Sequence, residues 1–365
     1  MVEVVPDRPL KGRGAISNRS GRFEPHGRVA VDDGWAGGGA DAAAAEDALA
    51  PARRTVVTLD ASRTVIARNQ SPDIPFDRSI NPYRGCEHGC VYCFARPTHA
   101  YLGLSPGLDF ETRLFAKPDA ARLLEAELAR PAYRPAVIAL GTNTDPYQPV
   151  ERRMGITRQV LEVLARARHP VAIVTKSDLV VRDLDILAPM ATAGLARVMV
   201  SVTTLDPTLA RRMEPRAPRP ALRLAAIRRL AGAGVPTGVM AAPMIPGLND
   251  DGLEAVLEAS AAAGAASAGY VLLRLPLEIK DLFAEWLATH YPDRAARVLS
   301  LVRQTRGGRL YDSAWRARMH GQGPVADLLK RRFALACKRH GLNRGDWTLD
   351  TTRFRRPSAQ GELFD

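Results

Sequence analysis

The feature that most constrains the fold is an alternation of short apolar runs with longer amphipathic stretches. The apolar runs are rich in Val, Ile and Leu and show little polar alternation, as strands covered on both faces do. They lie at residues 136–140, 171–175, 198–202, 237–242 and 270–275. Candidate helices lie before and between them, at residues 118–130, 155–167, 181–193, 219–233 and 251–263.

Several of these candidate helices end at a glycine that can serve as a C-cap, namely Gly194, Gly234 and Gly264. With a first strand at about 78–85, the pattern contains six strand–helix units. Such units form a parallel sheet with right-handed crossovers. We therefore predict an α/β, barrel-like sheet whose chemistry lies at the carboxyl ends of its strands.

The two ends of the chain depart from this pattern. Residues 1–60 contain Gly/Arg-rich and Gly/Ala-rich segments of low complexity, which favour a flexible arm and linker with Phe23 and Trp35 as docking points. Residues 61–300 form the expected core domain. Residues 301–365 form an expected helical extension with an exposed tail.

The 365 residues include 51 Lys and Arg against 39 Asp and Glu, a net charge of +12. This excess favours a polyanionic partner such as DNA or RNA, although a genome rich in Arg, Ala, Gly and Pro codons explains it equally well. No apolar signal core begins the chain, and no apolar run approaches the ~18 residues of a membrane span. We therefore expect a cytoplasmic protein without a membrane partner.

Three of the four cysteines lie within eight residues: Cys86, Cys90 and Cys93. This clustering favours a reducing compartment and a metal over a disulfide framework. Three thiolates on one short loop can hold three irons of a 4Fe–4S cube and leave the fourth iron open to another ligand. Zinc remains the main alternative, because Cys337, His88 or His99 could supply a fourth ligand.

The loop Cys86-x-x-x-Cys90-x-Tyr92-Cys93 resembles the signature of the radical S-adenosylmethionine (SAM) superfamily. The resemblance continues to about residue 320, through GTNTDPYQPVE, TKSDLVVRDLD, SVTTLD, MEPRAPRP and APMIPGLNDD. These segments are similar to the branch related to spore photoproduct lyase, often described as DNA repair photolyase-like. Within that branch, the chain resembles a bacterial subfamily with a Gly/Arg arm and a helical C-terminal extension.

The resemblance implies a partial (β/α)6 TIM-like barrel that binds a 4Fe–4S cluster and SAM at the carboxyl ends of its strands. Cys86, Cys90 and Cys93 would hold the cluster, with the SAM amino and carboxylate groups on the open iron. Enzymes of this kind accept an electron from a flavodoxin- or ferredoxin-type reductant and cleave SAM to a 5′-deoxyadenosyl radical, which abstracts a hydrogen atom. The branch implies a lyase-like DNA repair activity on nucleic acid.

The resemblance places SAM contacts at the strand ends: Tyr92, Gly141, Asn143, Thr144, Asp145, Lys176, Ser201, Thr203 and Arg223. Polar side chains there can bond the amino, carboxylate and ribose groups of SAM. Structural roles stay open, because Thr, Asn and Asp after a strand also cap helices and Arg223 can pair with Glu214. No residue is assigned a catalytic role, and Cys337 is expected to be a small buried residue on a helix.

Beyond the strands, two helices are expected within residues 279–305 and another at about 325–340. The chain then ends in Gln360-Gly-Glu-Leu363-Phe364, which resembles the pentapeptide that binds the bacterial sliding clamp. An exposed Leu–Phe pair with a Gln anchor can fill an apolar pocket on a partner. A tail folded back onto its own domain is an equal alternative.

Three functions fit these features. The first is a radical SAM enzyme that acts on nucleic acid, and the second is one that acts on an RNA base, a protein or a small molecule. The third is a non-catalytic metal-cluster protein that binds nucleic acid. The chain has no Cys within residues 94–300, so the hydrogen-donor cysteine of the lyase has no counterpart there, which argues against thymine-dimer repair by the lyase's mechanism.

Overall fold

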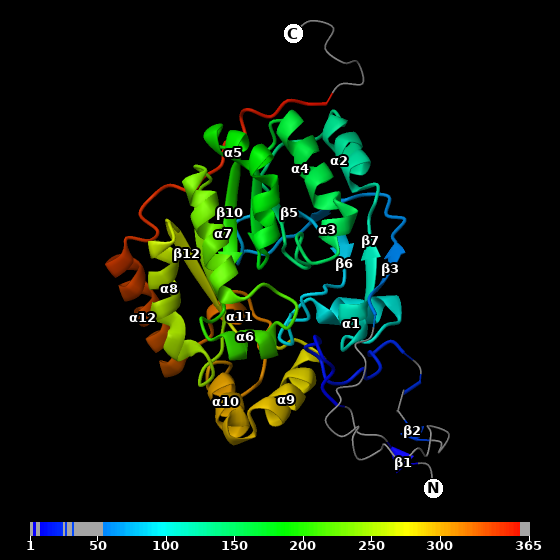
Figure 1. Cartoon of the computed structure of the whole chain (residues 1–365), viewed down its shortest axis with the longest axis vertical. Coiled ribbons are helices and arrows are strands. Elements are labelled where there is room, and N and C mark those ends of the chain that lie inside the picture. The colour runs from blue at the N-terminus through cyan, green and yellow to red at the C-terminus, as the bar shows by residue number, and fades with distance from the viewer. Residues whose placement is uncertain (1–2, 5–7, 25, 28–30, 33–53, 358–365) are drawn as a thin grey trace, which may run out of the picture.

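A computed structural model describes residues 3–4, 8–24, 26–27, 31–32 and 54–357 of the chain (Figure 1). The predicted low-complexity linker, with Trp35, lies outside the described residues, as does the terminal tail with Gln360, Leu363 and Phe364. Within the described ranges, no helix combines the length and the apolar character of a membrane span.

The core is a seven-stranded sheet with the order β12-β11-β10-β9-β8-β5-β4. All neighbours are parallel except β4 and β5. The register aligns Leu140, Ile173 and Val198, all fully buried, across three neighbouring strands. The strands are β4 (Ile66–Arg68), β5 (Arg78–Ile80), β8 (Ile138–Leu140), β9 (Val171–Thr175), β10 (Ala196–Ser201), β11 (Thr237–Met244) and β12 (Ser267–Leu272).

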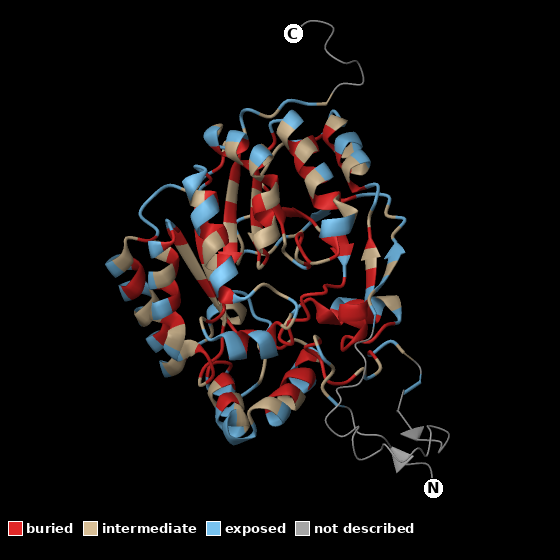
Figure 2. Cartoon of the chain, viewed as in Figure 1, coloured by how far each residue is buried: buried red, intermediate tan, exposed pale blue. Residues whose placement is uncertain are grey.

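Five helices alternate with the strands along the chain, as expected, and cover the sheet (Figure 1). They are α2 (Ala120–Ala129), α4 (Ile156–Arg166), α5 (Leu184–Thr192), α7 (Pro220–Gly232) and α8 (Leu253–Ala262). Their inner faces are buried and their outer faces exposed (Figure 2), as amphipathic helices on a sheet require. Gly194, Gly234 and Gly264 follow three of these helices with φ of +73°, +76° and +102°, so the predicted glycine stops are confirmed.

A smaller sheet, which the sequence did not indicate, flanks the cysteine loop. Its order is β3-β7-β6, formed by Val56–Leu59, Arg113–Ala116 and Tyr83–Arg84. The predicted first strand at 78–85 is therefore split, with β5 in the large sheet and β6 in the small one. The 3-10 helix η1 (Arg96–Leu102) and the short helix α1 (Asp109–Thr112) lie between β6 and β7.

Further helices lie at the carboxyl ends of the strands or beside β12. The two helices predicted within 279–305 are confirmed as α9 (Ile279–His290) and α10 (Pro292–Gln304). The helix predicted at 325–340 is confirmed as α12 (Pro324–His340), which packs on α8 and β12. The remaining helices are α3 (Glu151–Met154), η2 (Asp178–Asp183), α6 (Pro207–Met213), η3 (Asp250–Gly252) and α11 (Ala317–His320), and β1 (Glu3–Val4) pairs with β2 (Val31–Asp32).

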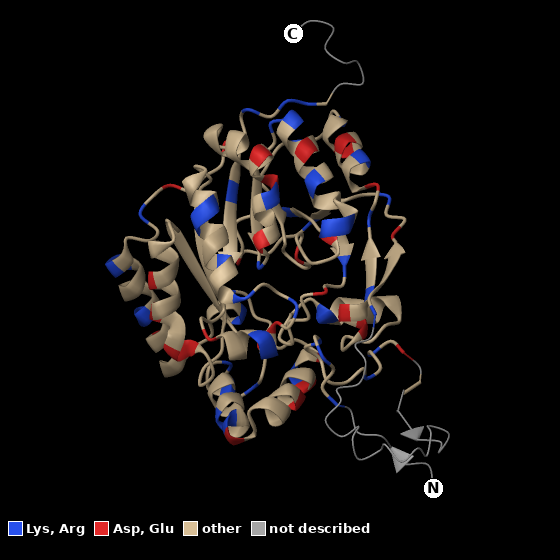
Figure 3. Ribbon diagram, in the orientation of Figure 1, with Lys and Arg blue, Asp and Glu red and all other residues tan. Residues whose placement is uncertain are grey.

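After α12 the chain runs without regular structure past the amino ends of the parallel strands. The backbone N–H of Asp350 donates to the carbonyl of Gly194 at 2.9 Å, and that of Arg355 donates to Ala167 at 2.8 Å. The exposed basic residues of this segment, and those spread over the outer helices, are visible in Figure 3. Residues 350–357 contain no helix or strand.

The expectation of a flexible arm over residues 1–60 is wrong for two of its segments. Residues 13–17 are buried, and Val56–Leu59 forms strand β3. Glycine and arginine suggested a solvated arm, but the backbone of this segment finds hydrogen-bond acceptors in the folded core. Phe23 does dock, because its ring lies 5.1 Å from that of Tyr101.

Candidate active site

The three cysteines line one cavity of about 630 Å³ at the carboxyl ends of the strands, a volume typical of cofactor and ligand sites. We call it the central cavity. The thiols of Cys86, Cys90 and Cys93 are free of disulfides. The fourth cysteine, Cys337, is buried on α12 and contacts Asn343, so it lies outside the wall of the central cavity.

Tight turns shape the loop that carries the three cysteines. The N–H of Gly89 donates to the carbonyl of Cys86 at 3.3 Å, and the N–H of Cys93 donates to that of Cys90 at 3.2 Å. Gly89 has a φ of +67°, and a Cβ there would lie 2.7 Å from Oε2 of Glu111. A larger residue is therefore excluded both by its backbone conformation and by space.

Arg96 stabilises the cysteine loop through hydrogen bonds to its backbone. This fully buried side chain donates to the carbonyls of Cys90 and Gly89 at 2.8 and 3.2 Å and to Oε1 of Glu111 at 2.5 Å. A buried arginine requires this many acceptors. Sequence reasoning missed Arg96 and Glu111, because nothing in their local pattern separates a buried charged pair from a solvated one.

Six of the nine predicted SAM contacts line the central cavity: Tyr92, Gly141, Asn143, Asp145, Lys176 and Ser201. They come from the cysteine loop and from the ends of β8, β9 and β10. Gly141 has a φ of +86°, and a Cβ there would lie 1.9 Å from the carbonyl oxygen of Val174. Glycine at position 141 therefore lets the end of β8 lie directly against the backbone of β9.

The carboxylate of Asp145 ties two strand ends together. It accepts from the Thr175 hydroxyl at 2.6 Å and from the Lys176 N–H at 2.7 Å, and it lies 3.4 Å from Nδ1 of His88. Burial alone would raise its pKa, but His88 and the surrounding donors outweigh burial and lower the pKa of Asp145 to about 2. Asp145 is thus a fixed negative charge on the cavity wall.

Three predicted SAM contacts do not line the central cavity: Thr144, Thr203 and Arg223. The hydroxyl of Thr144 donates to the carbonyl of Tyr83 at 2.9 Å. Arg223 forms a fully buried ion pair with Glu214, which is the structural role that the sequence left open. These side chains are occupied by neighbours within the protein and lie outside the cavity lining, and their assignment as SAM contacts stays a prediction.

The Glu214–Arg223 pair orients Tyr92. The Tyr92 hydroxyl and the Thr203 hydroxyl both donate to Oε1 of Glu214, the latter at 2.7 Å. Burial would raise the pKa of Glu214, but Arg223 and Lys176 outweigh it and lower that pKa to about 2. The ring of Tyr92 then faces the cavity, with the Lys176 ammonium 5.8 Å from its centre.

The donor set fits an iron–sulfur cluster. Burial raises the pKa of the Cys90 thiol to about 12 and that of Cys86 well above its ordinary value. Thiolates at these positions therefore need a strong positive charge beside them, which iron ions supply. Among the described residues, no three His, Cys, Asp or Glu side chains gather closely enough to hold a single metal ion.

Comparison with known proteins identifies the family. Residues 80–259 match the radical SAM superfamily. An uncharacterised protein of Mycobacterium tuberculosis is 41% identical over 243 residues, which cover 65% of this chain and 72% of the relative. The chain belongs to the radical SAM superfamily. An uncharacterised protein of Methanocaldococcus jannaschii is 27% identical over 171 residues, which cover 47% of this chain and 61% of that protein.

Among solved structures, this radical SAM protein is similar to spore photoproduct lyase complexed with dinucleoside spore photoproduct. The TM-score is 0.55 at 17% sequence identity, covering 78% of this chain and 80% of the lyase. A mutant of the lyase gives a TM-score of 0.54 at 18% identity, covering 79% and 80%. At this identity the likeness concerns the fold, and it confirms the predicted partial barrel.

Membership in the radical SAM superfamily decides between the 4Fe–4S cluster and the zinc site, which the cysteine loop alone left open. Radical SAM enzymes use a 4Fe–4S cluster and SAM, so these are the cofactors of this chain. The zinc site and the non-catalytic binding protein are excluded. The protein is a radical SAM enzyme, and the central cavity is its candidate active site.

Proposed function

We propose that this radical SAM enzyme abstracts a hydrogen atom from nucleic acid. The observation that carries the proposal is a part of the cavity wall where two aromatic side chains each pair with an arginine. The guanidinium of Arg274 lies 4.6 Å from the ring centre of Phe94, and that of Arg318 lies 4.1 Å from Trp315. All four side chains line the central cavity.

The two rings are unusually exposed for their type. Phe94 is 40% and Trp315 55% exposed, although large apolar side chains are mostly buried. Exposed rings stack on nucleic-acid bases irrespective of sequence, and arginine adds a cationic face to such a stack. This pairing therefore suits a base-bearing substrate better than an apolar small molecule or a polypeptide.

The two arginines differ in their partners. Arg318 donates to Asp73 at 2.5 Å and to Ser71 at 2.6 Å, so its charge is balanced. Arg274 donates to the Met319 sulfur at 3.5 Å, its Nε is buried without a hydrogen bond, and the nearby Asp73, whose pKa it helps to lower, hydrogen-bonds Arg318 instead. Its charge is available to a phosphate, the anion that arginine binds in bidentate fashion.

Two wider observations support a nucleic-acid substrate. The chain carries a net charge of +12, which favours polyanionic partners. The structurally similar spore photoproduct lyase was solved in complex with dinucleoside spore photoproduct. DNA repair is thus the activity that we propose first, with an RNA, protein or small-molecule substrate as the alternative.

In this proposal the cluster ligands are Cys86, Cys90 and Cys93, and the SAM contacts are Gly141, Asn143, Asp145, Lys176 and Ser201, with Tyr92 beside them. The bound cofactors supply a carbon radical that removes hydrogen from the substrate. The chain itself orients the two ligands and excludes water. Burial would lower the pKa of Lys176, but negative groups around it, Glu214 among them, outweigh burial and raise that pKa, so the ammonium can support an anionic group.

An isotope-transfer experiment tests the proposal. The anaerobically reconstituted, reduced enzyme is incubated with SAM and fully deuterated DNA, RNA or nucleotide pools, and the released 5′-deoxyadenosine is analysed by mass spectrometry. Deuterium from DNA supports the proposal, and deuterium from RNA alone moves the substrate to the alternative. Cleavage of SAM without deuterium uptake from any nucleic acid contradicts it.

Binding measurements give a second, independent readout. Replacement of Arg274 by Ser should weaken binding of a fluorescent single-stranded oligonucleotide. It should also make the slope of log affinity against log salt concentration shallower, by the amount that about one phosphate contact contributes. Arg122→Ser, in an exposed pair on α2, is the matched control. Equal affinities and equal salt slopes for both variants would remove the phosphate role of Arg274.

The C-terminal motif suggests a protein partner. We propose that Gln360, Leu363 and Phe364 bind a bacterial sliding clamp, and that a flavodoxin- or ferredoxin-type protein is the reductant. Clamp binding is measured with the full chain and with a chain ending at residue 357. The same affinity for both chains would refute the clamp proposal and leave the enzymatic one unaffected.

A further inference from the structure

A short N-terminal segment is buried against the cysteine loop. Arg13 and Ile16 are 7% and 4% exposed, whereas Lys11 and Arg19 on either side are exposed. We propose that residues 13–18, which we call the N-terminal strap, are positioning residues that hold the cysteine loop in its cluster-binding shape. This inference rests on the proposed role of that loop as the cluster site.

The strap contacts the carboxylate that supports the loop. The backbone N–H of Gly14 donates to Oε2 of Glu111 at 2.9 Å, and that of Ala15 donates to Oε1 at 2.8 Å. Arg13 adds a bond to the Glu111 carbonyl at 3.0 Å. The Glu111 side chain is fully buried, so the strap supplies two of the three donors described for its carboxylate, the third being Arg96.

Hydrogen bonds connect the Glu111 carboxylate to the cysteine loop through Arg96. Glu111 accepts from Arg96, and Arg96 donates to the carbonyl oxygens of Gly89 and Cys90. Strap, carboxylate, guanidinium and loop carbonyls thus form one buried network. Buried networks of this kind are rigid when every member is satisfied and costly when one member is lost.

The strap also fits the loop sterically. A Cβ on Gly14 would lie 1.8 Å from the carbonyl oxygen of Gly89, so only glycine allows this contact. Ile16 packs in the hydrophobic cluster that contains Cys90 and Val91. The strap therefore covers the loop through backbone contact at Gly14 and apolar packing at Ile16.

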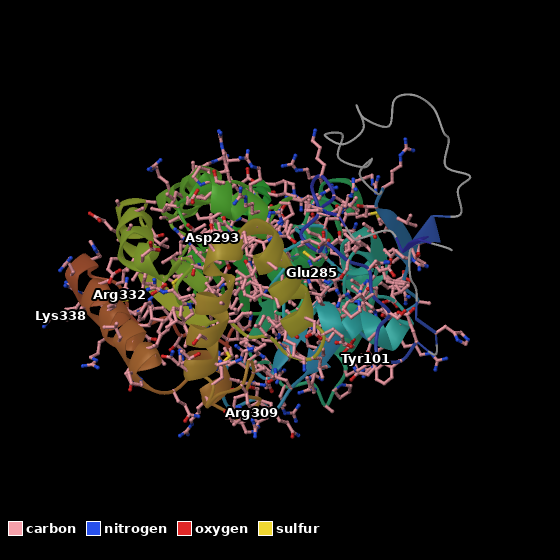
Figure 4. All side chains as sticks on the ribbon, turned by 90° about the horizontal axis from the view of Figure 1, so that it is seen from below. Tyr101, Glu285, Asp293, Arg309, Arg332 and Lys338 are labelled. Carbon is pink, nitrogen blue, oxygen red and sulfur yellow. The ribbon has the colours of Figure 1, made fainter. Side chains whose placement is uncertain are left out.

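The C-terminal end of the strap is also fixed. Asn18 forms reciprocal hydrogen bonds with Asp109, accepting from its N–H at 2.8 Å and donating to its carboxylate at 3.1 Å. Farther on, Arg19 pairs with Glu285 at 3.1 Å and Arg22 with Glu278 at 2.8 Å. Glu285 is labelled in Figure 4, which views the molecule from the side of α9 and α10.

The test uses Gly14→Val in the full chain, with Gly27→Val as the control, because a Cβ on Gly27 meets nothing within 4 Å. In the cluster-free protein, hydrogen exchange of the amides of residues 86–93 should accelerate about tenfold in Gly14→Val. That factor corresponds to about 1.4 kcal/mol, the scale of one lost hydrogen bond to a charged group. Exchange in β9 and β10 should stay unchanged.

In the reconstituted protein, the rate of iron release to a chelator should rise by a similar factor for Gly14→Val and stay unchanged for Gly27→Val. Asn18→Ala, which loosens one anchor without a steric clash, should give a smaller change in the same direction. Unchanged exchange and unchanged iron release in Gly14→Val would overturn the inference, as would acceleration spread evenly over the whole core.

The exchange experiment needs no cluster. If the cysteine loop did not bind a cluster at all, reconstitution of the parent chain would fail, yet strap-dependent protection of residues 86–93 would still be measurable. Failure of the proposed function and failure of the positioning role therefore give different results.

Discussion

Replacing Arg223 by Met removes one half of the buried ion pair behind Tyr92. Arg223 and Glu214 are each about 1% exposed or less, and Glu214 also accepts from the hydroxyls of Tyr92 and Thr203. The variant leaves a buried carboxylate without its nearest cation. Breaking a buried pair in this way costs about 3–5 kcal/mol, a large share of a typical stability of about 5–15 kcal/mol.

The pKa of Glu214 gives a second route to the same magnitude. Burial raises this pKa, but the opposing effect of Arg223 and Lys176 is larger, so the pKa falls from 4.5 to about 2. A difference of this size corresponds to about 3 kcal/mol at neutral pH. Because the folded-state pKa is depressed, this stability is present above pH ~4.5 and is lost as the pH falls toward ~2.

Without Arg223 the pKa of Glu214 should shift upward instead of downward, because burial then favours the protonated acid. The deficit of Arg223→Met should be largest near pH 7 and should shrink as the pH falls toward 5. Urea unfolding of the cluster-free protein, followed by circular dichroism at pH 7 and pH 5, measures it. A loss below about 1 kcal/mol at pH 7, or an equal loss at both pH values, would refute this reasoning.

Two companion variants separate charge from packing. Glu214→Gln combined with Arg223→Met removes both charges and should recover much of the loss, because an apolar or neutral replacement of a buried pair is often tolerated. Arg122→Met removes the exposed pair with Asp119 on α2 and should change stability by less than about 0.5 kcal/mol.

Three further outcomes are expected. Cys90→Ser should reconstitute without a 4Fe–4S signal in electron paramagnetic resonance, whereas Cys337→Ser should keep it. Gly141→Ala forces a Cβ to 1.9 Å from the Val174 carbonyl at a φ of +86°; the strain should lower stability by more than about 1 kcal/mol and weaken SAM binding in calorimetry. Trp315→Ala should weaken single-stranded oligonucleotide binding in fluorescence anisotropy by about 1–3 kcal/mol.

The repetitive part of the fold could be predicted because its signal is local. The run at residues 171–175 coincides with β9, since a strand buried on both faces is apolar at nearly every position. The helices between strands were also predictable from nearby residues, namely the spacing of their apolar positions and the glycines at their ends. Topology predicted that the strand ends carrying Gly141, Lys176 and Ser201 would meet, because parallel strands end at one edge, whereas the family resemblance singled out these residues.

The rest depends on contacts between residues far apart in the chain. The small sheet joins residues 56–59 to 113–116, and its strands are too short to show a pattern of their own. Thr203 lies at a strand end as predicted, but its hydroxyl is taken by Glu214, which no spacing rule reveals. Burial of the Gly/Arg segment likewise depends on Glu111, about a hundred residues away.

The span of these contacts bears on the order in which the molecule assembles. Arg19 meets Glu285, a partner 266 positions later in the chain, and contacts of such separation form late in folding. During synthesis, which proceeds from the N-terminus, the segment that covers the cysteine loop lacks this anchor until α9 has left the ribosome. The bonds of Gly14 to Glu111 and of Asn18 to Asp109 need only the first third of the chain, so the segment can cover the cysteine loop long before the Arg19–Glu285 pair completes its attachment.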